Sequence, residues 1–380
     1  MNRNIIYLLL GALFITSCLS TNATVEVVVS NPTDIERKLE VVEVSLNDIY
    51  DRVNPGSSDN IIVTNKLGDQ IPYQLIYNGE DQPSALIFAV SLDAHESDTV
   101  IIKKGTPEEF NPLVYGRLVP ERKDDFTWEN NLVAYRVYGP ALEETGEISG
   151  GLDIWVKKTE NLVIDKWYKD DLAGIASYHD DHGEGVDFYK VGPTLGLGMT
   201  APYYDNKLCL GKNFTEANII ENGPLRFTFE LKYAPYMVGN DEIVESRIIS
   251  LEANKHLNKV IKTFNSSSSD LTLATGLVMS SESENSTYSD KDNGIIAYQL
   301  PEDTNNGIIF TGVINPTGFS DCEIANGHFL GFNSYSSGES YTYYTGGGWN
   351  KYGFDSFDSW INYLQQQREI INNPIIITIN

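Results

Sequence analysis

Hydrophobic and polar residues alternate in short runs along almost the whole chain. The segment 25–30 reads Val-Glu-Val-Val-Val-Ser, and Leu225–Tyr233 alternates more regularly. A period of two residues places successive side chains on opposite faces of a β-strand. Most breaks between these runs carry Gly, Pro, Asn or Asp, which favour turns. The pattern predicts an all-β protein, built as a large antiparallel β-sandwich with two extended sheets.

The strand and turn signals divide the chain into two parts. Residues 24–105 are expected to form an N-terminal β lobe. Pro107–Asp125 is charged and interrupted by proline, so it is interpreted as a connection. Residues 106–380 as a whole are expected to form the main β-sandwich, which carries the functional site.

One C-terminal helix interrupts the β pattern. Phe357, Ile361 and Leu364 recur at helical spacing, and Asn372-Asn373-Pro374 ends the run. A mixed run, Leu162–Trp167, is interpreted as a further short strand.

The N-terminus has the features of a lipoprotein signal peptide, assigned to residues 1–17. Ile5–Ile15 is apolar but too short to span a bilayer comfortably. Ile15-Thr16-Ser17-Cys18 resembles a bacterial lipobox, and an acylated Cys18 would tether the chain to a membrane surface through residues 18–23. We therefore expect a protein that is lipid-anchored in the cell envelope of a Gram-negative bacterium, at the outer membrane or in the periplasm. The alternative is an ordinary signal peptide with a chance cysteine.

Composition narrows the range of partners. The formal net charge of −26 argues against nucleic acid, because the phosphate backbone would be repelled. The chain contains 22 Tyr and 5 Trp, which suit β structure and also offer faces on which sugars stack. Beyond Cys18 the sequence contains Cys209 and Cys322, and it leaves open whether they pair.

The stretch Ser177–Pro193 gathers the residue types that carry chemistry. It contains His179, His182, Glu184 and Tyr189, which are the candidate catalytic residues. Imidazole exchanges protons near neutral pH. Two histidines three residues apart with a nearby carboxylate also admit a divalent cation, although no standard ligand spacing is matched. A polar loop that satisfies its own hydrogen bonds is the third interpretation.

A second group of residues is expected to hold the substrate. Arginine binds carboxylates through two parallel hydrogen bonds, glycine-rich turns admit a ligand, and tryptophan stacks on sugar rings. An arginine inside an apolar strand is unusual, and Arg136 is such a residue. Simple ion pairs and a turn at a sheet edge are the structural alternatives. The candidate substrate-binding residues are Arg122, Trp128, Glu129, Arg136, Lys190 and Trp349.

Six motifs together resemble a secreted family of unknown function from Bacteroidota. Members of that family typically lie in polysaccharide-utilisation loci, often beside hydrolases that act on unsaturated uronyl sugars from pectin. The resemblance covers nearly the whole mature chain, and it implies a sandwich in the style of the galactose-mutarotase-like supersandwich and a glycan substrate. The motifs are Val119–Arg122, Asp125–Asn130, Ala134–Leu142, Asp165–Tyr168, Tyr178–Pro193 and Gly347–Trp349.

A carbohydrate-active enzyme that cleaves a uronic-acid-containing oligosaccharide by β-elimination is the preferred function. The reaction removes a proton α to a carboxylate, so it needs a cation on that carboxylate and a nearby base. Arg136 or Lys190 would supply the cation, and His179, His182 or Tyr189 the base. The interpretation requires that Arg136 and the pair Trp128-Glu129 meet the histidine-rich loop in one hollow.

Two other functions remain as alternatives. A glycoside hydrolase would use paired carboxyl groups, here Glu184 with Glu129 or Asp187. A non-catalytic glycan-binding lipoprotein would depend on Trp128 and Trp349 instead. In every case the expected partner is an acidic or neutral oligosaccharide.

Overall fold

The computed structural model describes residues 24–380, apart from 268–269 and 281–285. The expected signal peptide, Cys18 and the tether 18–23 lie outside the described residues. Antiparallel strands dominate the described chain, which confirms the predicted all-β class. No helix within these ranges is long and apolar enough to cross a membrane.

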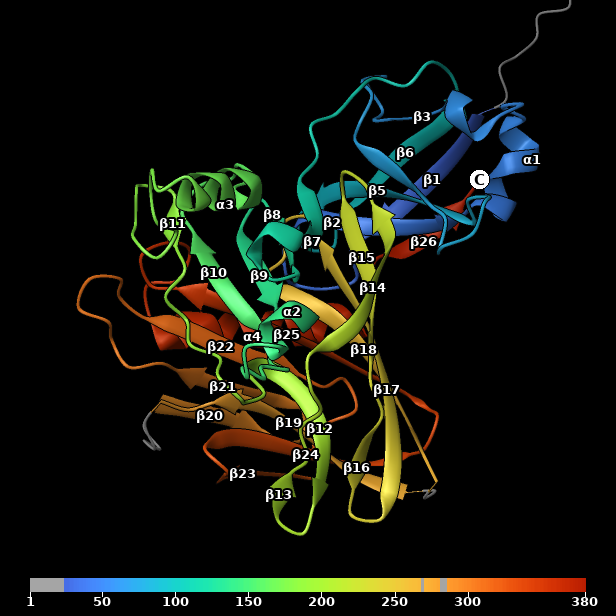
Figure 1. The fold of residues 1–380 in the computed structure, drawn as a ribbon. Helices are drawn as coiled ribbons and strands as arrows, with labels where there is room; N and C mark the ends of the chain where they lie inside the picture. Colours follow the sequence, from blue (N-terminus) through green and yellow to red (C-terminus); the bar gives the residue numbers. More distant parts are fainter. Residues whose placement is uncertain (1–23, 268–269, 281–285) are drawn as a thin grey trace, which may run out of the picture.

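A nine-stranded antiparallel sheet is the largest element (Figure 1). Along each of its strands, alternate side chains point to the interior and to the opposite face. In spatial order its strands are β14 (Phe214–Asn222), β15 (Arg226–Tyr233), β17 (Asp241–Glu252), β18 (Leu257–Ser266), β25 (Ser340–Trp349), β22 (Ile309–Ile314), β21 (Ile295–Gln299) and β20 (Thr287–Asp290), and β16 (Tyr236–Val238) pairs with β17.

Two five-stranded sheets pack on the interior face of this sheet and share one hydrophobic core with it. The core contains stacked rings such as Phe126 and Phe229, whose centroids are 4.3 Å apart. One of these sheets orders β11 (Gly185–Val186), β10 (Asp153–Lys157), β9 (Val133–Val137), β8 (Asp125–Asn130) and β7 (Val114–Val119). The other orders β13 (Lys207–Leu208), β12 (Leu197–Tyr204), β19 (Asp270–Val278), β24 (His328–Ser336) and β23 (Asp321–Ala325).

The N-terminal segment forms a separate lobe with its own core (Figure 1). The last strand, β26, also belongs to this lobe, because its Ile379 is paired with Val27 on β1. One sheet orders β26 (Ile376–Ile379), β1 (Thr24–Ser30), β6 (Ser97–Lys104) and β3 (Ile61–Thr64). The second orders β2 (Arg37–Ser45), β5 (Ala85–Leu92) and β4 (Tyr73–Ile76), and α1 (Leu46–Val53) packs beside them.

The predicted C-terminal helix is confirmed as α4 (Phe357–Asn372). The Ser356 side chain accepts a hydrogen bond from the Ser359 N–H and Ser359 bonds back, so the first turn is capped. Trp360 and Leu364 are fully buried, and α4 packs on β21 and β22. This side of the nine-stranded sheet therefore has a second, smaller core.

The strand predicted at Leu162–Trp167 is wrong, because a helix, α3 (Ile164–Leu172), begins within it. Ile164, Trp167 and Tyr168 bury one face of α3 at helical spacing. The helix begins where a buried carboxylate, described below, accepts its first N–H groups. The short helices α1 and α2 (Pro140–Glu143) were also absent from the prediction.

We expect Trp360→Ala to lower the free energy of unfolding by about 3–5 kcal/mol. The indole is fully buried, meets Phe354 edge-on at 4.9 Å between centroids, and donates its N–H to the Thr311 carbonyl at 3.1 Å. Urea unfolding measures the change. Tyr352→Ala, at an exposed ring, should stay within about 0.5 kcal/mol of the parent; equal losses in the two variants would contradict this assignment of the core.

Candidate active site

Adjacent strands place ionisable side chains on one buried face of the β7–β11 sheet. Asp125 begins β8, Arg136 lies on β9 and Asp153 begins β10. Arg136 is the register partner of both Thr127 and Asp153, so these side chains share a face. Helix α3 and the loop 177–187 cover this face, while the opposite face packs on the nine-stranded sheet.

Arg136 lies at the centre of a buried ion group. Its Nε and Nη2 donate to Asp153 Oδ2 at 2.9 and 2.5 Å, and Nη2 also donates to Asp187 Oδ2 at 2.8 Å. All three side chains are almost fully buried. Burial raises the pKa of Asp187 well above its usual range, and the neighbouring Asp153 carboxylate adds to the effect that Arg136 opposes.

Asp125 adds a third carboxyl group to the same region. Its residue is completely buried, and neither oxygen forms a well-directed hydrogen bond with the described residues. Arg122 Nη1 lies 3.9 Å from its Oδ2. Burial raises the pKa of Asp125 to about 6, and Arg136, Arg122 and the Gly139 N–H only partly offset this. A buried carboxyl group with a raised pKa and no well-directed hydrogen bond is typical of functional sites.

The loop 177–187 closes over Arg136, whereas Trp128, expected in the same hollow, is buried in the main core. The Tyr178 hydroxyl lies 3.3 Å from Arg122 Nε and 3.5 Å from Arg136 Nη1. His179 Nδ1 lies 3.0 Å from the Asp187 carbonyl oxygen and 3.6 Å from Asp187 Oδ2. The loop is therefore held to the sheet through its first and last residues.

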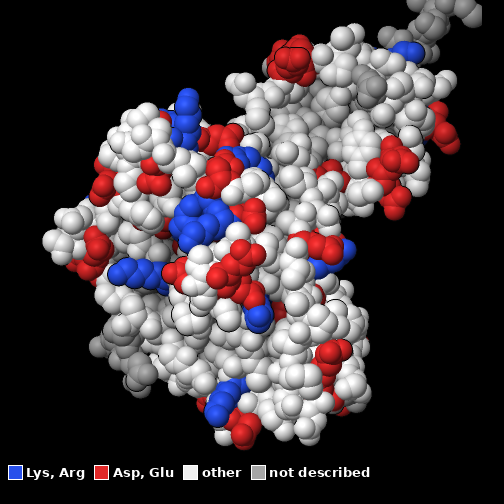
Figure 2. All heavy atoms as spheres, viewed as in Figure 1, with Lys and Arg blue, Asp and Glu red and all other residues white. Residues whose placement is uncertain are grey.

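These residues form what we call the Arg136 cluster: Arg122, Asp125, Arg136, Asp153, Tyr178, His179 and Asp187. It has a buried inner part and a solvent-facing edge, where the side chains of His179 and Arg122 are 57% and 29% exposed. Figure 2 shows basic and acidic side chains side by side on the surface over this region. The arrangement offers a substrate the Arg122 guanidinium, an imidazole, a phenol and carboxyl groups, while the Arg136 guanidinium is engaged by Asp153 and Asp187.

The other predicted catalytic residues lie around this edge. His182 is exposed, and its Nε2 lies 3.0 Å from the Ser177 carbonyl. Glu184 binds Lys166 at 2.7 Å, which lowers the Glu184 pKa. His182 and Glu184 line a hollow of about 60 Å³ together with Tyr178.

The remaining two residues of the loop region differ sharply in exposure. Tyr189 is buried, with its hydroxyl unpaired among the described residues, and burial raises its pKa well above the usual range. Because its hydroxyl therefore stays protonated, Tyr189 is a poor base. Lys190 is exposed.

Three of the predicted substrate-binding residues outside the cluster are buried and bonded to other groups. Trp128 is buried in the main core and donates to Asn258 Oδ1 at 2.7 Å, and Trp349 is buried and donates to the Asn306 carbonyl at 2.6 Å. Neither has an exposed face for a sugar. Glu129 shares the face of Arg136, but it is fully buried against Lys157, with Lys157 Nζ at 2.7 Å from Oε2.

Glu129 has a structural role that its neighbours in the sequence do not reveal. The N–H groups of Val163 and Ile164 donate to its carboxylate at 2.7 and 2.8 Å. A negative charge at these unpaired N–H groups stabilises the first turn of α3. Glu129 therefore fixes the helix that covers the Arg136 cluster.

Asp125 and Asp153 were missed as site residues. Asp153 stands in the apolar run Leu152–Val156, so it carries the same signal that identified Arg136, namely a charge inside an apolar strand. Asp125 is next to Asp124 in a charged stretch, and only the fold distinguishes it. Within the described ranges, no group of three His, Cys, Asp or Glu residues is arranged to hold a metal ion.

Comparison with known proteins places the chain in a family. It belongs to the family described as "Domain of unknown function (DUF4861)", which matches residues 29–377. It is 28% identical to uncharacterized protein P7 of Formosa agariphila, a member of the Bacteroidota, over 98% of both chains. The resemblance to a family of unknown function with members in Bacteroidota is thus confirmed.

Two solved structures from Enterococcus faecalis share the fold. One is described as a protein in glycosyl hydrolase family 38 (TM-score 0.55) and the other as an α-mannosidase (TM-score 0.54), each at 12% identity. Each match covers 94% of this chain but only 47% and 46% of those chains, so this chain spans about half of their length. The chain therefore shares its fold with part of two proteins that are described as carbohydrate-active.

Asp125→Asn is expected to stabilise the protein near pH 8 and to change its stability little near pH 4. The folded-state pKa of about 6 exceeds the usual 3.8, so the folded protein binds the extra proton between these values. Stability of the parent therefore falls as pH rises through that interval. Once ionised, the buried charge costs about 3 kcal/mol, which the neutral amide avoids.

Thermal unfolding across this pH range measures the effect of Asp125→Asn. Asp81→Asn, at an exposed loop position, is the control and should stay within about 0.5 kcal/mol. A stability difference that does not depend on pH would show that the Asp125 carboxyl is not the group responsible.

Glu129→Gln should cost about 3–5 kcal/mol of stability, because it leaves the buried Lys157 ammonium without its counter-charge. Urea unfolding measures this loss, with Glu160→Gln at an exposed position as the control. A loss below about 1 kcal/mol would contradict a buried pair that anchors α3.

Proposed function

We propose that the chain is a carbohydrate-active enzyme that cleaves a uronic-acid-containing oligosaccharide by β-elimination at the Arg136 cluster. The observation that carries the proposal is the position of the Tyr178 hydroxyl between two guanidinium groups, with His179 beside it at the solvent edge. The fold shared with a glycosyl hydrolase family 38 protein supports a glycan substrate. A uronate gives the partly exposed Arg122 guanidinium an anion to bind.

Arg122 is the group that binds the substrate carboxylate. Arg136 already donates to Asp153 and Asp187, so its binding capacity is occupied and it acts as a positioning residue. Arg122 is partly exposed, and its carboxylate neighbour Asp125 lies 3.9 Å away. Pairing a guanidinium with the carboxylate stabilises the negative charge that develops when the α proton leaves.

His179 is positioned to act as the base. A backbone carbonyl only accepts hydrogen bonds, so the 3.0 Å contact of Nδ1 with the Asp187 oxygen places the hydrogen on Nδ1. The other ring nitrogen, Nε2, then accepts the proton from the carbon α to the carboxylate. The released electron pair forms a carbon–carbon double bond as the glycosidic C–O bond on the next carbon breaks. Tyr178 donates a proton to the leaving oxygen.

A glycoside hydrolase is the second candidate. Two carboxyl groups with raised pKa, Asp125 and Asp187, lie in the same cluster. One protonated and one ionised carboxyl is the requirement of that reaction. This pair replaces the one expected from the sequence, because Glu129 is committed to Lys157 and α3.

The setting that we propose follows from the sequence. A lipidated Cys18 would hold the enzyme in the cell envelope, within reach of oligosaccharides released outside the cytoplasm. The net charge of −26 disfavours nucleic acid as a partner.

His179→Ala and Tyr178→Phe are each expected to slow cleavage of uronate-containing pectic oligosaccharides by about 10²–10⁴-fold. Elimination leaves a conjugated double bond, so product formation is followed by ultraviolet absorbance. His95→Ala is the matched control, since His95 is an exposed histidine of the N-terminal lobe that pairs with Asp34. Its rate should equal that of the parent.

Other outcomes identify the other functions. New reducing ends without ultraviolet absorbance would establish the hydrolase and overturn elimination. A glycan that is retarded in native electrophoresis but remains intact would show a binding protein. Equal rates for the parent and both cluster variants would remove the Arg136 cluster from the reaction.

A further inference from the structure

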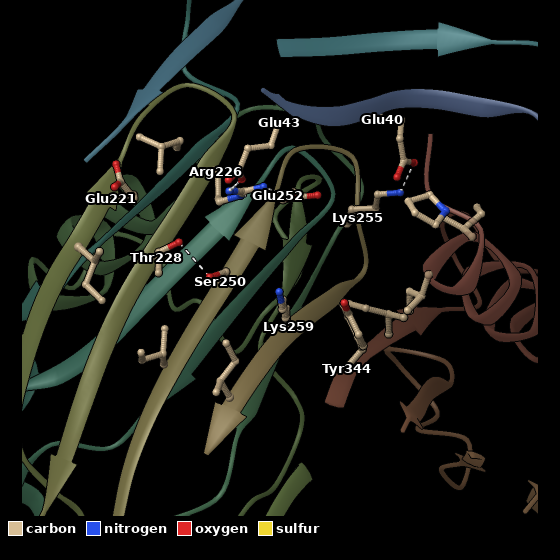
Figure 3. Close-up of a pocket in the computed structure, with 18 of the residues that line it drawn as sticks. Glu40, Glu43, Glu221, Arg226, Thr228, Ser250, Glu252, Lys255, Lys259 and Tyr344 are labelled. Carbon is tan, nitrogen blue, oxygen red and sulfur yellow. Dashed lines mark hydrogen bonds and ion pairs between the residues drawn. The ribbon is translucent and has the colours of Figure 1, made fainter. Parts of the chain in front are cut away.

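A second hollow lies on the opposite side of the nine-stranded sheet from the Arg136 cluster. It has a volume of about 590 Å³ and is enclosed by the N-terminal lobe, α4 and the outward face of β15, β17, β18 and β25. Figure 3 shows side chains from these elements pointing into it. The core side chain Phe229 and the groove side chain Thr228 are neighbours on β15, so the two sites face away from each other.

A row of polar side chains crosses the floor of this groove. Thr228 is the register partner of Ser250, Ser250 that of Lys259, and Lys259 that of Tyr344. Side chains in register on adjacent strands share a face, so the row runs across four strands and spans roughly 14 Å. The Thr228 and Ser250 hydroxyls bond to each other at 2.9 Å.

Most charges in the groove neutralise one another. Arg226 binds Glu43 at 2.6 Å and Glu252 at 2.7 Å, and Lys255 binds Glu40 at 2.6 Å. Figure 3 shows the Lys255–Glu40 contact at the edge of the groove below the lobe. These pairs connect the lobe to the sheet, and their two cations against three carboxylates leave one net negative charge at this end.

Two further charged residues complete the lining. Glu221 accepts the backbone N–H groups of Tyr77 and Asn78 at 2.8 and 2.6 Å, so it too holds the lobe. Lys259 is exposed and forms no ion pair with the described residues. Lys259 is therefore the groove cation without an ion-pair partner among the described residues, and it lies in the row of hydroxyl groups.

The rest of the floor is apolar. Ile248 and Ile261 are register partners one step along the same face, and Ile370 of α4 lines the opposite wall. Hydroxyl groups beside an apolar strip match a sugar chain, which has C–H faces and hydroxyl edges. The single free ammonium matches a sparsely charged chain better than one with an anion on every ring.

We propose that this groove binds a neutral stretch of an oligosaccharide that carries one uronate, with the uronate carboxylate on Lys259 and the sugar hydroxyls on Ser250 and Tyr344. The inference rests on the proposed function for the class of glycan. It adds a binding site that holds the chain on the face opposite the Arg136 cluster. One molecule would thus contact a long glycan, or two glycans, at separate places.

The test is binding by the Tyr178→Phe protein, which keeps the groove while the Arg136 cluster is altered. Isothermal titration uses a defined oligosaccharide of neutral sugars with one uronate. Lys259→Met in this background is expected to weaken binding about tenfold, the loss typical of one charge-assisted hydrogen bond. Lys259→Arg should retain most of the affinity.

Lys232→Met is the matched control, because Lys232 lies on the same strand face beyond the groove and pairs with Glu216. Its affinity should equal that of the background protein. The same oligosaccharide with its carboxyl group reduced to an alcohol should bind with the weaker affinity, and Lys259→Met should then cause no further loss. Unchanged affinity for the uronate-containing oligosaccharide on Lys259→Met would overturn the proposal.

The two proposals fail separately. If the parent protein never cleaves the glycan but Lys259→Met weakens binding, the β-elimination proposal fails and the groove stands. If cleavage depends on His179 and Tyr178 but binding to the Tyr178→Phe protein ignores Lys259, the groove proposal fails and the enzyme stands.

Discussion

A single buried guanidinium organises the covered face of the β7–β11 sheet. Arg136 holds Asp153 on the next strand and Asp187 at the end of a loop, so one side chain joins a strand pair to a segment about fifty residues further on. Burial raises the pKa of the three carboxyl groups around it, and the positive charge of Arg136 only partly offsets this. The packing of α3 and of the aromatic rings stacked on Trp155 offsets the free-energy cost of burying these charges.

The same sheet contains two kinds of buried polar group, one fully hydrogen-bonded and one not, at its opposite ends. At one end Glu129 and Lys157 form an ion pair. The Glu129 carboxylate also accepts the first N–H groups of α3, so the pair anchors that helix. At the other end Asp125 keeps both oxygens without a well-directed bond among the described residues. A satisfied network specifies structure, whereas unsatisfied groups are the ones able to engage a ligand.

Much of the architecture could be predicted from the sequence, since alternation and turn residues are local signals. The all-β class, helix α4 and the meeting of Arg136 with the histidine-rich loop were anticipated. Trp128 and Glu129 could not both reach one hollow, because adjacent residues of a strand point to opposite faces. That error was avoidable. The assignment of Asp125 to the site, and of the row of polar side chains to the groove, depends on which strands are neighbours. Register between distant strands has no signal in a single sequence.

The pairing of β26 with β1 has a consequence for the order of folding. Strand β1 is made long before β26, so the sheet of the N-terminal lobe keeps an open edge until the far end of the chain has emerged. If the chain crosses a membrane before it folds, this delay is an advantage, because the earliest segment cannot reach its final form while the remainder is still in transit. Closure of that edge is then the step that completes this sheet of the N-terminal lobe.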